Sequence, residues 1–468
     1  MKFIAREFEL KELNKEFEQN RFSLAIIYGR RRVGKTFLIQ EFLKAKDGYY
    51  FVALESNHIV NLNLLSQAVY AACGYSPNLP DFENYENAFR FLFEQSLEKK
   101  FIFVIDEYPY LAESSPYVSS LLQNLIDEYR ERSKLFLILC GSSMSFMEEQ
   151  VLGYKSPLYG RRTSQFKIEP FNYLESGEFV AGYSNHDKAI VYGLTNGVAE
   201  YLTFFDDSLP LEENIVRNFF KTSGRLYEEP SNLLKQELRQ PRTYNDILFA
   251  ITSGASKLND ISNKLDVASG SLVYYMNSLK SLGLVERKTP VLNRKTKRPI
   301  YAIDDTMFRF WYRFVQPNLN IINLELGDLV YEKFVKDNLN GYMGSVFEKI
   351  SIEYYERRIK ASNLPFLPVD YGNWWGNDPR LKTESEIDML AYEKNGEYLF
   401  LEAKWRNAKT DQTVLKDLIG KSLHFNFEKA NYWLTSMSGC DNIEAQDRVE
   451  LIDLDDMYGV DIGGAKGL

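Results

Sequence analysis

The chain has 468 residues, of which 45% are hydrophobic and 26% charged, so wholesale disorder is excluded. At about 100–200 residues per domain, this length predicts roughly three domains. Three cysteines and three histidines are too few for a disulfide scaffold or a cluster of Cys or His metal ligands. No apolar run reaches the ~18–20 residues of a membrane span, and the charged start lacks a signal peptide. We therefore expect a cytoplasmic protein with no membrane partner.

Three short apolar runs alternate with helical stretches in the first part of the chain. They lie at 24–29 (LAIIYG), 101–106 (FIFVID) and 135–141 (LFLILCG). Apolar runs of this length that end abruptly in small or polar residues are typical of buried parallel strands. Residues 1–205 are therefore predicted to form one open α/β domain around a parallel sheet.

A glycine-rich motif follows the first of these strands. Its eight residues fit G-x-x-x-x-G-K-[ST]: Gly29, Arg30, Arg31, Arg32, Val33, Gly34, Lys35 and Thr36. The glycines let the backbone approach phosphates, so that its N–H groups and the next helix N-terminus face the anion. Lys35 would reach the β- and γ-phosphates, and Thr36 would offer its hydroxyl to magnesium. The motif predicts ATP and Mg²⁺ as cofactors.

The ends of the other two strands carry polar residues. We expect Asp106 to hold the magnesium hydration shell and Glu107 to orient or deprotonate the attacking water. The serine pair at 142–143 fits either a sensor of the γ-phosphate or a simple turn. The arginine pair at 161–162 fits either a transition-state arginine, in cis or from a neighbouring subunit, or a solvated loop.

The middle of the chain changes character. A polar helical connector is predicted over 206–243, and 244–315 reads as three short helices, two short strands and an aromatic helix, the winged-helix arrangement. The aromatic helix looks like packing rather than chemistry. A basic stretch at 287–298 holds six Lys and Arg residues and no acid, so it either contacts DNA phosphates or forms a solvated hairpin. A second connector is predicted over 316–340.

Two carboxylates and a lysine lie on two consecutive predicted strands of the last segment. Asp388 lies on the first strand, and Glu402 and Lys404 lie two apart on one face of the second. A metal-dependent phosphodiesterase needs carboxylates to hold magnesium against the scissile phosphate and a cation to stabilise the developing charge. The set is therefore either such a catalytic site or an ordinary solvated strand face.

The loop at 393–397 decides whether these carboxylates meet. The two-residue turn favoured by an Asn-Gly pair would set Asp388 opposite Ala403, on the other face from Glu402. A three-residue loop with Gly396 in the left-handed conformation instead pairs Asp388 with Glu402 and keeps apolar residues of both strands on one buried face. We predict the second register, with the two carboxylates close enough for one magnesium ion to bridge them.

Four segments together resemble one family. They are the opening box at 3–7, the loop at 29–36, the strand that ends in Asp106–Glu107 and the segment SPLYGRRTSQFKIEPF at 156–171. They resemble the archaeal-type ATPase family, which belongs to the AAA+/STAND class of P-loop NTPases. One departure is Ala199, where related chains tend to carry a proline.

The fused form of that family implies three folds in one chain. It predicts an α/β P-loop NTPase with a parallel sheet, then a winged-helix domain, then an α/β domain resembling PD-(D/E)XK nucleases over 341–468. In the resembled nuclease fold a helix glutamate completes the metal set with the two strand carboxylates, and Glu348 matches its position.

Two functions fit these features. The first is an ATP-binding and ATP-hydrolysing switch or motor coupled to a Mg²⁺-dependent nuclease-like domain that acts on or with DNA. The second is a nucleotide-dependent regulator whose C-terminal domain binds a partner without cleavage. The Asp388, Glu402 and Lys404 set favours the first, whereas the net charge of −9 favours the second. Assembly into a homo-oligomer stays open.

Overall fold

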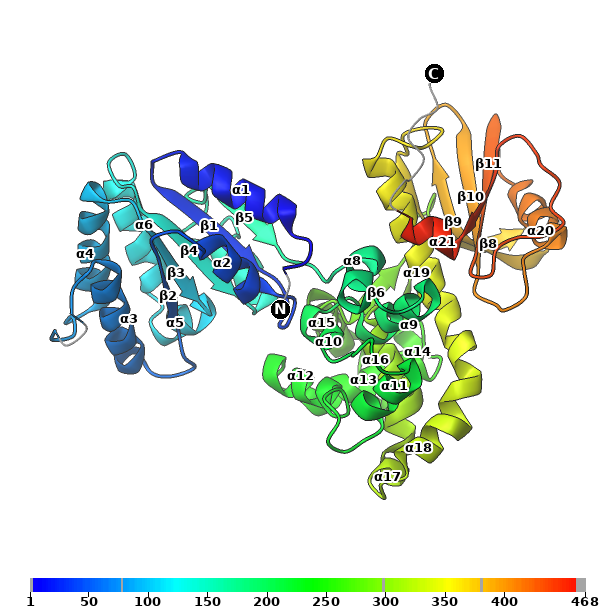
Figure 1. The fold of residues 1–468 in the computed structure, drawn as a ribbon, viewed down its shortest axis with the longest axis horizontal. Coiled ribbons are helices and arrows are strands. Elements are labelled where there is room, and N and C mark those ends of the chain that lie inside the picture. Colours follow the sequence, from blue (N-terminus) through cyan, green and yellow to red (C-terminus); the bar gives the residue numbers. More distant parts are fainter. Residues whose placement is uncertain (1–2, 77–78, 297–298, 379–381, 460–468) are drawn as a thin grey trace. The chain divides into compact units, whose positions relative to one another are not determined.

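The computed structural model describes residues 3–76, 79–296, 299–378 and 382–459. The chain divides into two compact units, Met1–Pro170 and Phe171–Leu468, each described here by itself (Figure 1). The domain boundaries that the sequence predicts stay predictions; they are 1–205, 206–243, 244–315, 316–340 and 341–468. None of the helices in the described ranges combines the length and apolarity needed to cross a membrane.

A five-stranded parallel sheet forms the centre of the first unit. Its strands follow the order β2-β3-β4-β1-β5 and all run in the same direction, which confirms the predicted parallel sheet. They are β1 (Ser23–Tyr28), β2 (Gly48–Val52), β3 (Ile102–Asp106), β4 (Phe136–Gly141) and β5 (Ser164–Lys167). The two outer strands escaped the sequence analysis because each is short and only partly apolar.

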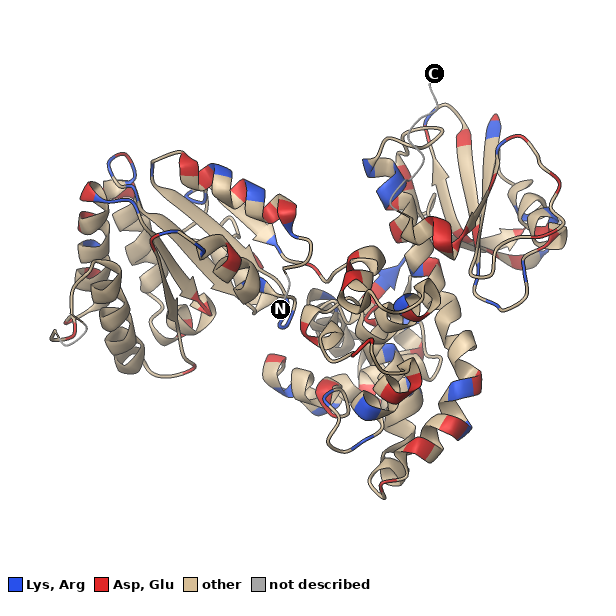
Figure 2. Ribbon diagram, in the orientation of Figure 1, with Lys and Arg blue, Asp and Glu red and all other residues tan. Residues whose placement is uncertain are grey.

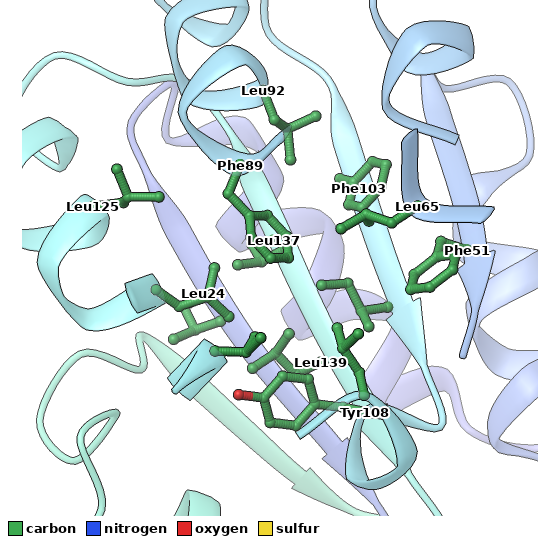
Figure 3. Packing of buried hydrophobic residues seen from close by; sticks show 14 of the residues in the cluster. Leu24, Phe51, Leu65, Phe89, Leu92, Phe103, Tyr108, Leu125, Leu137 and Leu139 are labelled. Atoms are coloured by element: carbon green, nitrogen blue, oxygen red, sulfur yellow. The ribbon is translucent and has the colours of Figure 1, made fainter. Parts of the chain in front are cut away.

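Helices cover both faces of this sheet. On one face α1 and α2 bury Leu13, Leu38 and Phe42, and on the other α3 to α6 enclose a larger cluster that includes Phe89 and Leu125 (Figure 3). The helices are α1 (Glu7–Glu18), α2 (Lys35–Leu43), α3 (His58–Ala72), α4 (Tyr85–Glu98), α5 (Tyr108–Ser114), α6 (Val118–Tyr129), α7 (Met144–Phe146) and the π-helix η1 (Met147–Val151). Burial of both faces explains why the three predicted strands read as continuous apolar runs.

The second unit begins with a helical region. The aromatic segment 308–315 is buried in it, as predicted, with the exception of two arginines. The elements are α8 (Tyr173–Gly177), η2 (Glu178–Val180), α9 (Asn185–Thr195), α10 (Ala199–Leu202), α11 (Leu211–Phe219), α12 (Glu229–Glu237), α16 (Thr306–Phe310), η3 (Trp311–Val315), η4 (Gln316–Asn318), α17 (Leu319–Ile322), α18 (Gly327–Val330), η5 (Tyr331–Val335) and η6 (Lys336–Asn338).

Three helices and a two-stranded antiparallel sheet lie within this region, in the order expected from the sequence. They are α13 (Pro241–Thr252), α14 (Leu258–Leu265), α15 (Ser269–Ser281), β6 (Val285–Lys288) and β7 (Ile300–Ile303). Ile247, Ile261 and Leu272, one from each helix, are fully buried.

A mixed five-stranded sheet, in the order β12-β11-β10-β9-β8, forms the end of the chain. β8, β9 and β10 are antiparallel neighbours, whereas β10, β11 and β12 run parallel. The elements are α19 (Leu339–Lys360), β8 (Asp370–Asp378), β9 (Thr383–Tyr392), β10 (Glu397–Lys404), α20 (Gln412–Ser422), β11 (Lys429–Ser436), β12 (Val449–Asp453) and α21 (Leu454–Tyr458).

The predicted register between β9 and β10 is confirmed. Met389 pairs with Leu401, a register that continues to Asp388 opposite Glu402, and Gly396 in the connecting loop has a φ of +81°. The expectation of a single buried face was wrong. α19 packs on β9 and β10, while α20 packs on β9, β10 and β11, and Leu390, Phe400 and Glu402, which have the alternate parity, are buried as well.

Candidate functional site

The glycine-rich motif lies at the carboxyl end of β1 and leads directly into α2. Gly34 precedes the helix with a φ of +95°, which glycine adopts without strain. At Gly29 the loop passes so close to a neighbouring segment that an added Cβ would lie 2.3 Å from the carbonyl oxygen of Ile168. This geometry gathers the backbone N–H groups of the loop and the N-terminus of α2, the arrangement that binds phosphate.

Lys35 is buried and folds back over this loop. Its Nζ donates hydrogen bonds to the carbonyl oxygens of Gly29, at 2.8 Å, and Arg30, at 2.9 Å. A bound phosphate would offer the ammonium group charged acceptors in place of these two neutral ones, and charge-assisted hydrogen bonds are the stronger kind. The ammonium group of Lys35 therefore lies at the loop, where the motif requires a phosphate contact.

Asp106 is the last residue of β3, and its carboxylate accepts hydrogen bonds from α2, from β2 and from the residue that follows it. Its Oδ1 accepts the N–H of Glu107 at 2.9 Å, and its Oδ2 accepts the hydroxyl of Thr36 at 3.4 Å and the hydroxyl of Tyr50. Burial, and then the charge of Asp106, raise the pKa of Tyr50, so the phenol stays a neutral donor. The Thr36 hydroxyl and the Asp106 carboxylate are hard oxygen donors, and this donor set fits Mg²⁺.

Glu107 is held beside the end of the neighbouring strand β4. The hydroxyl of Ser142 donates to its two carboxylate oxygens at 3.0 Å, and the Ser142 N–H donates to Oε2 at 3.3 Å. Glu107 itself has a φ of +50°, in a region that residues other than glycine seldom occupy. The carboxyl ends of β1, β3 and β4 thus bring together the loop, Asp106, Glu107 and Ser142, as parallel topology requires.

The arginine pair at 161–162 precedes β5, at the amino end of the parallel sheet and so at the edge opposite the loop, and both arginines have partners, as does Arg31 of the loop. Arg161 makes a two-pronged ion pair with Asp127, through contacts of 3.2 and 2.8 Å, and Arg31 donates to the hydroxyl of Tyr110 at 2.9 Å. Arg162 lies over the ring of Tyr159. In this structure Arg161 is ion-paired with Asp127 of α6, so its role at the transition state stays a prediction.

In the second unit, Asp388 in the middle of β9 lies across from the end of β10, which carries Glu402 and Lys404. The Oδ2 of Asp388 accepts the N–H of Ala403 at 2.8 Å. Burial, and then the charges of Glu402 and Glu348, hold the pKa of Asp388 well above its usual range. Glu348 lies on α19, half-buried, and burial raises its pKa as well. The three carboxylates therefore lie near enough to repel one another.

Two lysines are paired with Glu402. Lys404 Nζ lies 2.5 Å from Oε1, and Lys421 Nζ, from α20, lies 3.3 Å from Oε2. Carboxylate oxygens are suitable ligands for magnesium, but no group of three His, Cys, Asp or Glu side chains in the described ranges is arranged to hold a metal ion. The side chains as they lie form no ready metal site, and a bridging magnesium ion stays a prediction.

The basic stretch is partly neutralised by its surroundings. Arg294 makes a two-pronged ion pair with Asp370, both contacts 2.8 Å, and Lys288 pairs with Glu286 at 3.0 Å. Lys297 and Arg298 lie outside the described residues. Charges of both signs are intermingled along the drawn ribbon (Figure 2).

Sequence reasoning missed two residues of these sites. Tyr50, on β2, donates to Asp106, and Lys421, on α20, pairs with Glu402. Neither belongs to a motif, and each reaches its carboxylate only through packing. Amphipathic spacing along 412–422 could have indicated which face of α20 meets the sheet, but not that Lys421 meets Glu402.

Two segments of the chain match families of known proteins. Residues 3–205 match a family described as an ATPase domain predominantly from Archaea, and residues 311–416 match a family of archaeal and bacterial proteins of unknown function. The second match carries no activity with it.

Two proteins of one archaeon are similar to this chain in sequence. An uncharacterized protein of Methanocaldococcus jannaschii is 34% identical over 424 residues, which cover 90% of this chain and 92% of that protein. An uncharacterized ATP-binding protein of the same organism is 50% identical over 44 residues, 9% of this chain and 75% of its own length.

A solved structure shares the fold. The Walker-type ATPase of Pyrococcus abyssi covers 66% of this chain and 96% of its own, with 22% identity and a TM-score of 0.53. The chain therefore belongs to the archaeal ATPase family of P-loop NTPases, followed by a C-terminal domain found in archaeal and bacterial proteins of unknown function.

Proposed function

We propose that this protein is an ATP-hydrolysing switch coupled to a Mg²⁺-dependent nuclease-like domain that acts on DNA. The observation that carries the ATPase part is the meeting of Lys35, Asp106 and Glu107 at one edge of the parallel sheet. These residue types, in this order of strands, supply a phosphate contact, a magnesium partner and a base.

Each residue has a separate task in this proposal. The loop N–H groups and Lys35 bind the phosphates, and Thr36 and Asp106 hold the magnesium ion, which neutralises charge on the phosphates when it is bound. Glu107 orients the attacking water and accepts its proton. Ser142 fixes the direction of the Glu107 carboxylate, since its hydroxyl contacts both oxygens.

Three features support the nuclease-like part. The order α19-β8-β9-β10-α20-β11 gives a mixed sheet with a crossover helix, and Asp388 lies opposite Glu402 in the register of its two central strands. The raised pKa of Asp388 indicates crowded negative charge, which a bound cation would relieve. Lys404 adds a cation on the same strand as Glu402.

One observation favours the second function, a regulator that binds a partner without cleavage. Lys404 and Lys421 both contact Glu402, so the carboxylate is already neutralised within the protein. In that function the buried set is a structural ion-pair network rather than a catalytic centre.

The test measures phosphate release and DNA integrity in the same reactions. Purified protein is incubated with Mg-ATP and plasmid, linear or single-stranded DNA. Glu107→Gln should bind ATP but hydrolyse it at least about 100-fold more slowly, and Lys35→Ala should lose both binding and turnover. Glu402→Gln should abolish DNA cleavage and leave ATP turnover intact.

The outcomes separate the two parts of the proposal. Parental ATP turnover in Glu107→Gln would reject the assigned base. Intact DNA with all three substrates, in the presence of normal ATP turnover, would reject the nuclease-like part and favour the regulator.

A further inference from the structure

The hydroxyl of Tyr50 reaches the candidate ATPase site from β2, a strand that carries no motif residue. Tyr50 pairs with Val104 of β3, and in the same register Val52 pairs with Asp106. Residues two apart on a strand share one face of the sheet, so Tyr50 and Asp106 lie on the same face as diagonal neighbours. This is the face that α2 covers, since Tyr50 packs against the buried cluster that holds Val104 and Leu38.

The carboxylate of Asp106 is held here by neutral donors. Its side chain is buried, and a buried charge needs hydrogen bonds to replace those of water. The Oδ2 atom accepts the hydroxyls of Thr36, at 3.4 Å, and of Tyr50. A contact of 3.4 Å lies at the weak end of hydrogen-bond distances, so the direction of Oδ2 depends mainly on Tyr50.

The other oxygen of this carboxylate is tied to the residue assigned as the base. The Oδ1 atom of Asp106 accepts the N–H of Glu107 at 2.9 Å, and Glu107 has a φ of +50°. A carboxylate that rotated would lose this bond together with the bond from Tyr50. The hydroxyl of Tyr50 therefore steadies the proposed magnesium partner and the backbone of the base at the same time.

The packing of β2 does not require this hydroxyl. Phenylalanine at position 50 would keep the ring against the same apolar cluster and would lose only the hydrogen bond to Asp106. Burial, and then the charge of Asp106, raise the pKa of Tyr50, so the phenol remains a donor at neutral pH. The hydroxyl thus acts on the carboxylate rather than on the core.

We propose that Tyr50 is a positioning residue of the ATPase site, which fixes the direction of the Asp106 carboxylate for magnesium. The inference rests on the proposed function, because that function assigns Asp106 to the magnesium ion. Mg²⁺ demands near-octahedral geometry, so a carboxylate that is already fixed does not have to be ordered when the metal binds. Residues that hydrogen-bond a metal ligand in this way typically contribute about 10–100-fold to metal affinity.

The experiment measures how much Mg²⁺ strengthens nucleotide binding. The full chain is titrated into a fluorescent, non-hydrolysable ATP analogue in EDTA and in saturating Mg²⁺, and fluorescence anisotropy gives two dissociation constants. Their ratio is the gain in affinity that the metal supplies, and it needs no turnover. In Tyr50→Phe this ratio should fall about tenfold or more, whereas the dissociation constant in EDTA should keep its parental value.

Tyr49 provides the matched control. It precedes Tyr50 on β2 but packs against the cluster on the opposite face of the sheet. Tyr49→Phe removes a hydroxyl from the same strand and should keep the parental ratio. If the hydroxyl of Tyr50 serves folding alone, Tyr50→Phe changes both dissociation constants together or neither, and either result would overturn the proposal. An equal fall of the ratio in both variants would overturn it as well.

Asp106→Ala separates this inference from the proposed function, which requires that the variant lose most of the metal-dependent gain. A lost gain in Asp106→Ala, together with a parental ratio in Tyr50→Phe, would overturn the role of Tyr50 alone. A parental ratio in Asp106→Ala would reject the magnesium role of Asp106, and the inference with it.

Discussion

Replacing Glu353 by glutamine should make the stability of the second unit less dependent on pH. Glu353 lies half-buried on α19, and burial raises its pKa from 4.5 to about 7, against the opposing effects of Lys349 and Tyr192. Between these two pH values the folded protein holds a proton that the unfolded chain releases. The free energy of unfolding therefore falls as pH rises from about 4.5 to 7, and the penalty is complete above that window.

The magnitude follows from the two pKa values. At 1.36 kcal/mol per pH unit, the difference corresponds to about 3 kcal/mol, which is an upper bound because solvent screens the charge of a half-buried side chain. Glutamine does not titrate, so the stability of Glu353→Gln relative to the parental protein should increase by up to about 3 kcal/mol between pH 4.5 and pH 8. The amide can still accept the N–H of Tyr173.

Tryptophan fluorescence makes this measurement specific to the second unit. All five tryptophans lie there: Trp311, Trp374, Trp375, Trp405 and Trp433. Urea unfolding at pH 4.5, 6 and 8 gives the free energy for parental protein, Glu353→Gln and Glu213→Gln, an exposed glutamate of α11 that serves as control. A gap between Glu353→Gln and the parental protein that stays constant across these pH values would refute the reasoning.

Three further predictions concern other parts of the molecule. Gly29→Ala should destabilise the first unit by about 1–3 kcal/mol, because its Cβ would stand 2.3 Å from the carbonyl oxygen of Ile168; an unchanged thermal transition of that unit would contradict this. Ser142→Ala should lower the kcat of ATP hydrolysis about tenfold without changing KM, because Glu107 loses its hydroxyl contact; equal kcat values would exclude the positioning role. Replacing the four Lys and Arg residues at 294–298 by alanine should reduce the salt dependence of DNA binding, whereas an unchanged slope would make the stretch a solvated hairpin.

Local patterns predicted a large part of the fold. The three central strands of the first sheet were readable because burial on both faces demands continuous apolar runs, while the partly exposed β2 and β5 left no such signal. The register of β9 and β10 was readable because side chains alternate with a period of two, so a slip of one residue would place the apolar residues of the two strands on opposite faces. The sequence did not predict that α20 covers the other face of these two strands.

The candidate ATPase site was also predicted only in part from the sequence. Residues 29–36 carry their chemistry within eight consecutive positions, and the turn, the helix start and the lysine all follow from local backbone geometry. The contact between Tyr50 and Asp106 joins positions 56 residues apart, and no spacing in the sequence predicts it.

The sequence by itself therefore determined which residue types could perform phosphate chemistry, and on which strands and loops they lie. Only the tertiary structure decided which of them are engaged. Arg294 is paired with Asp370 and Glu402 with two lysines, whereas Tyr50, which belongs to no motif, donates its hydroxyl to Asp106. The physical reason is that turn geometry, helix starts and side-chain periodicity act between near neighbours in the chain. The partner of a charged side chain depends instead on which distant elements pack against it and how much water they exclude.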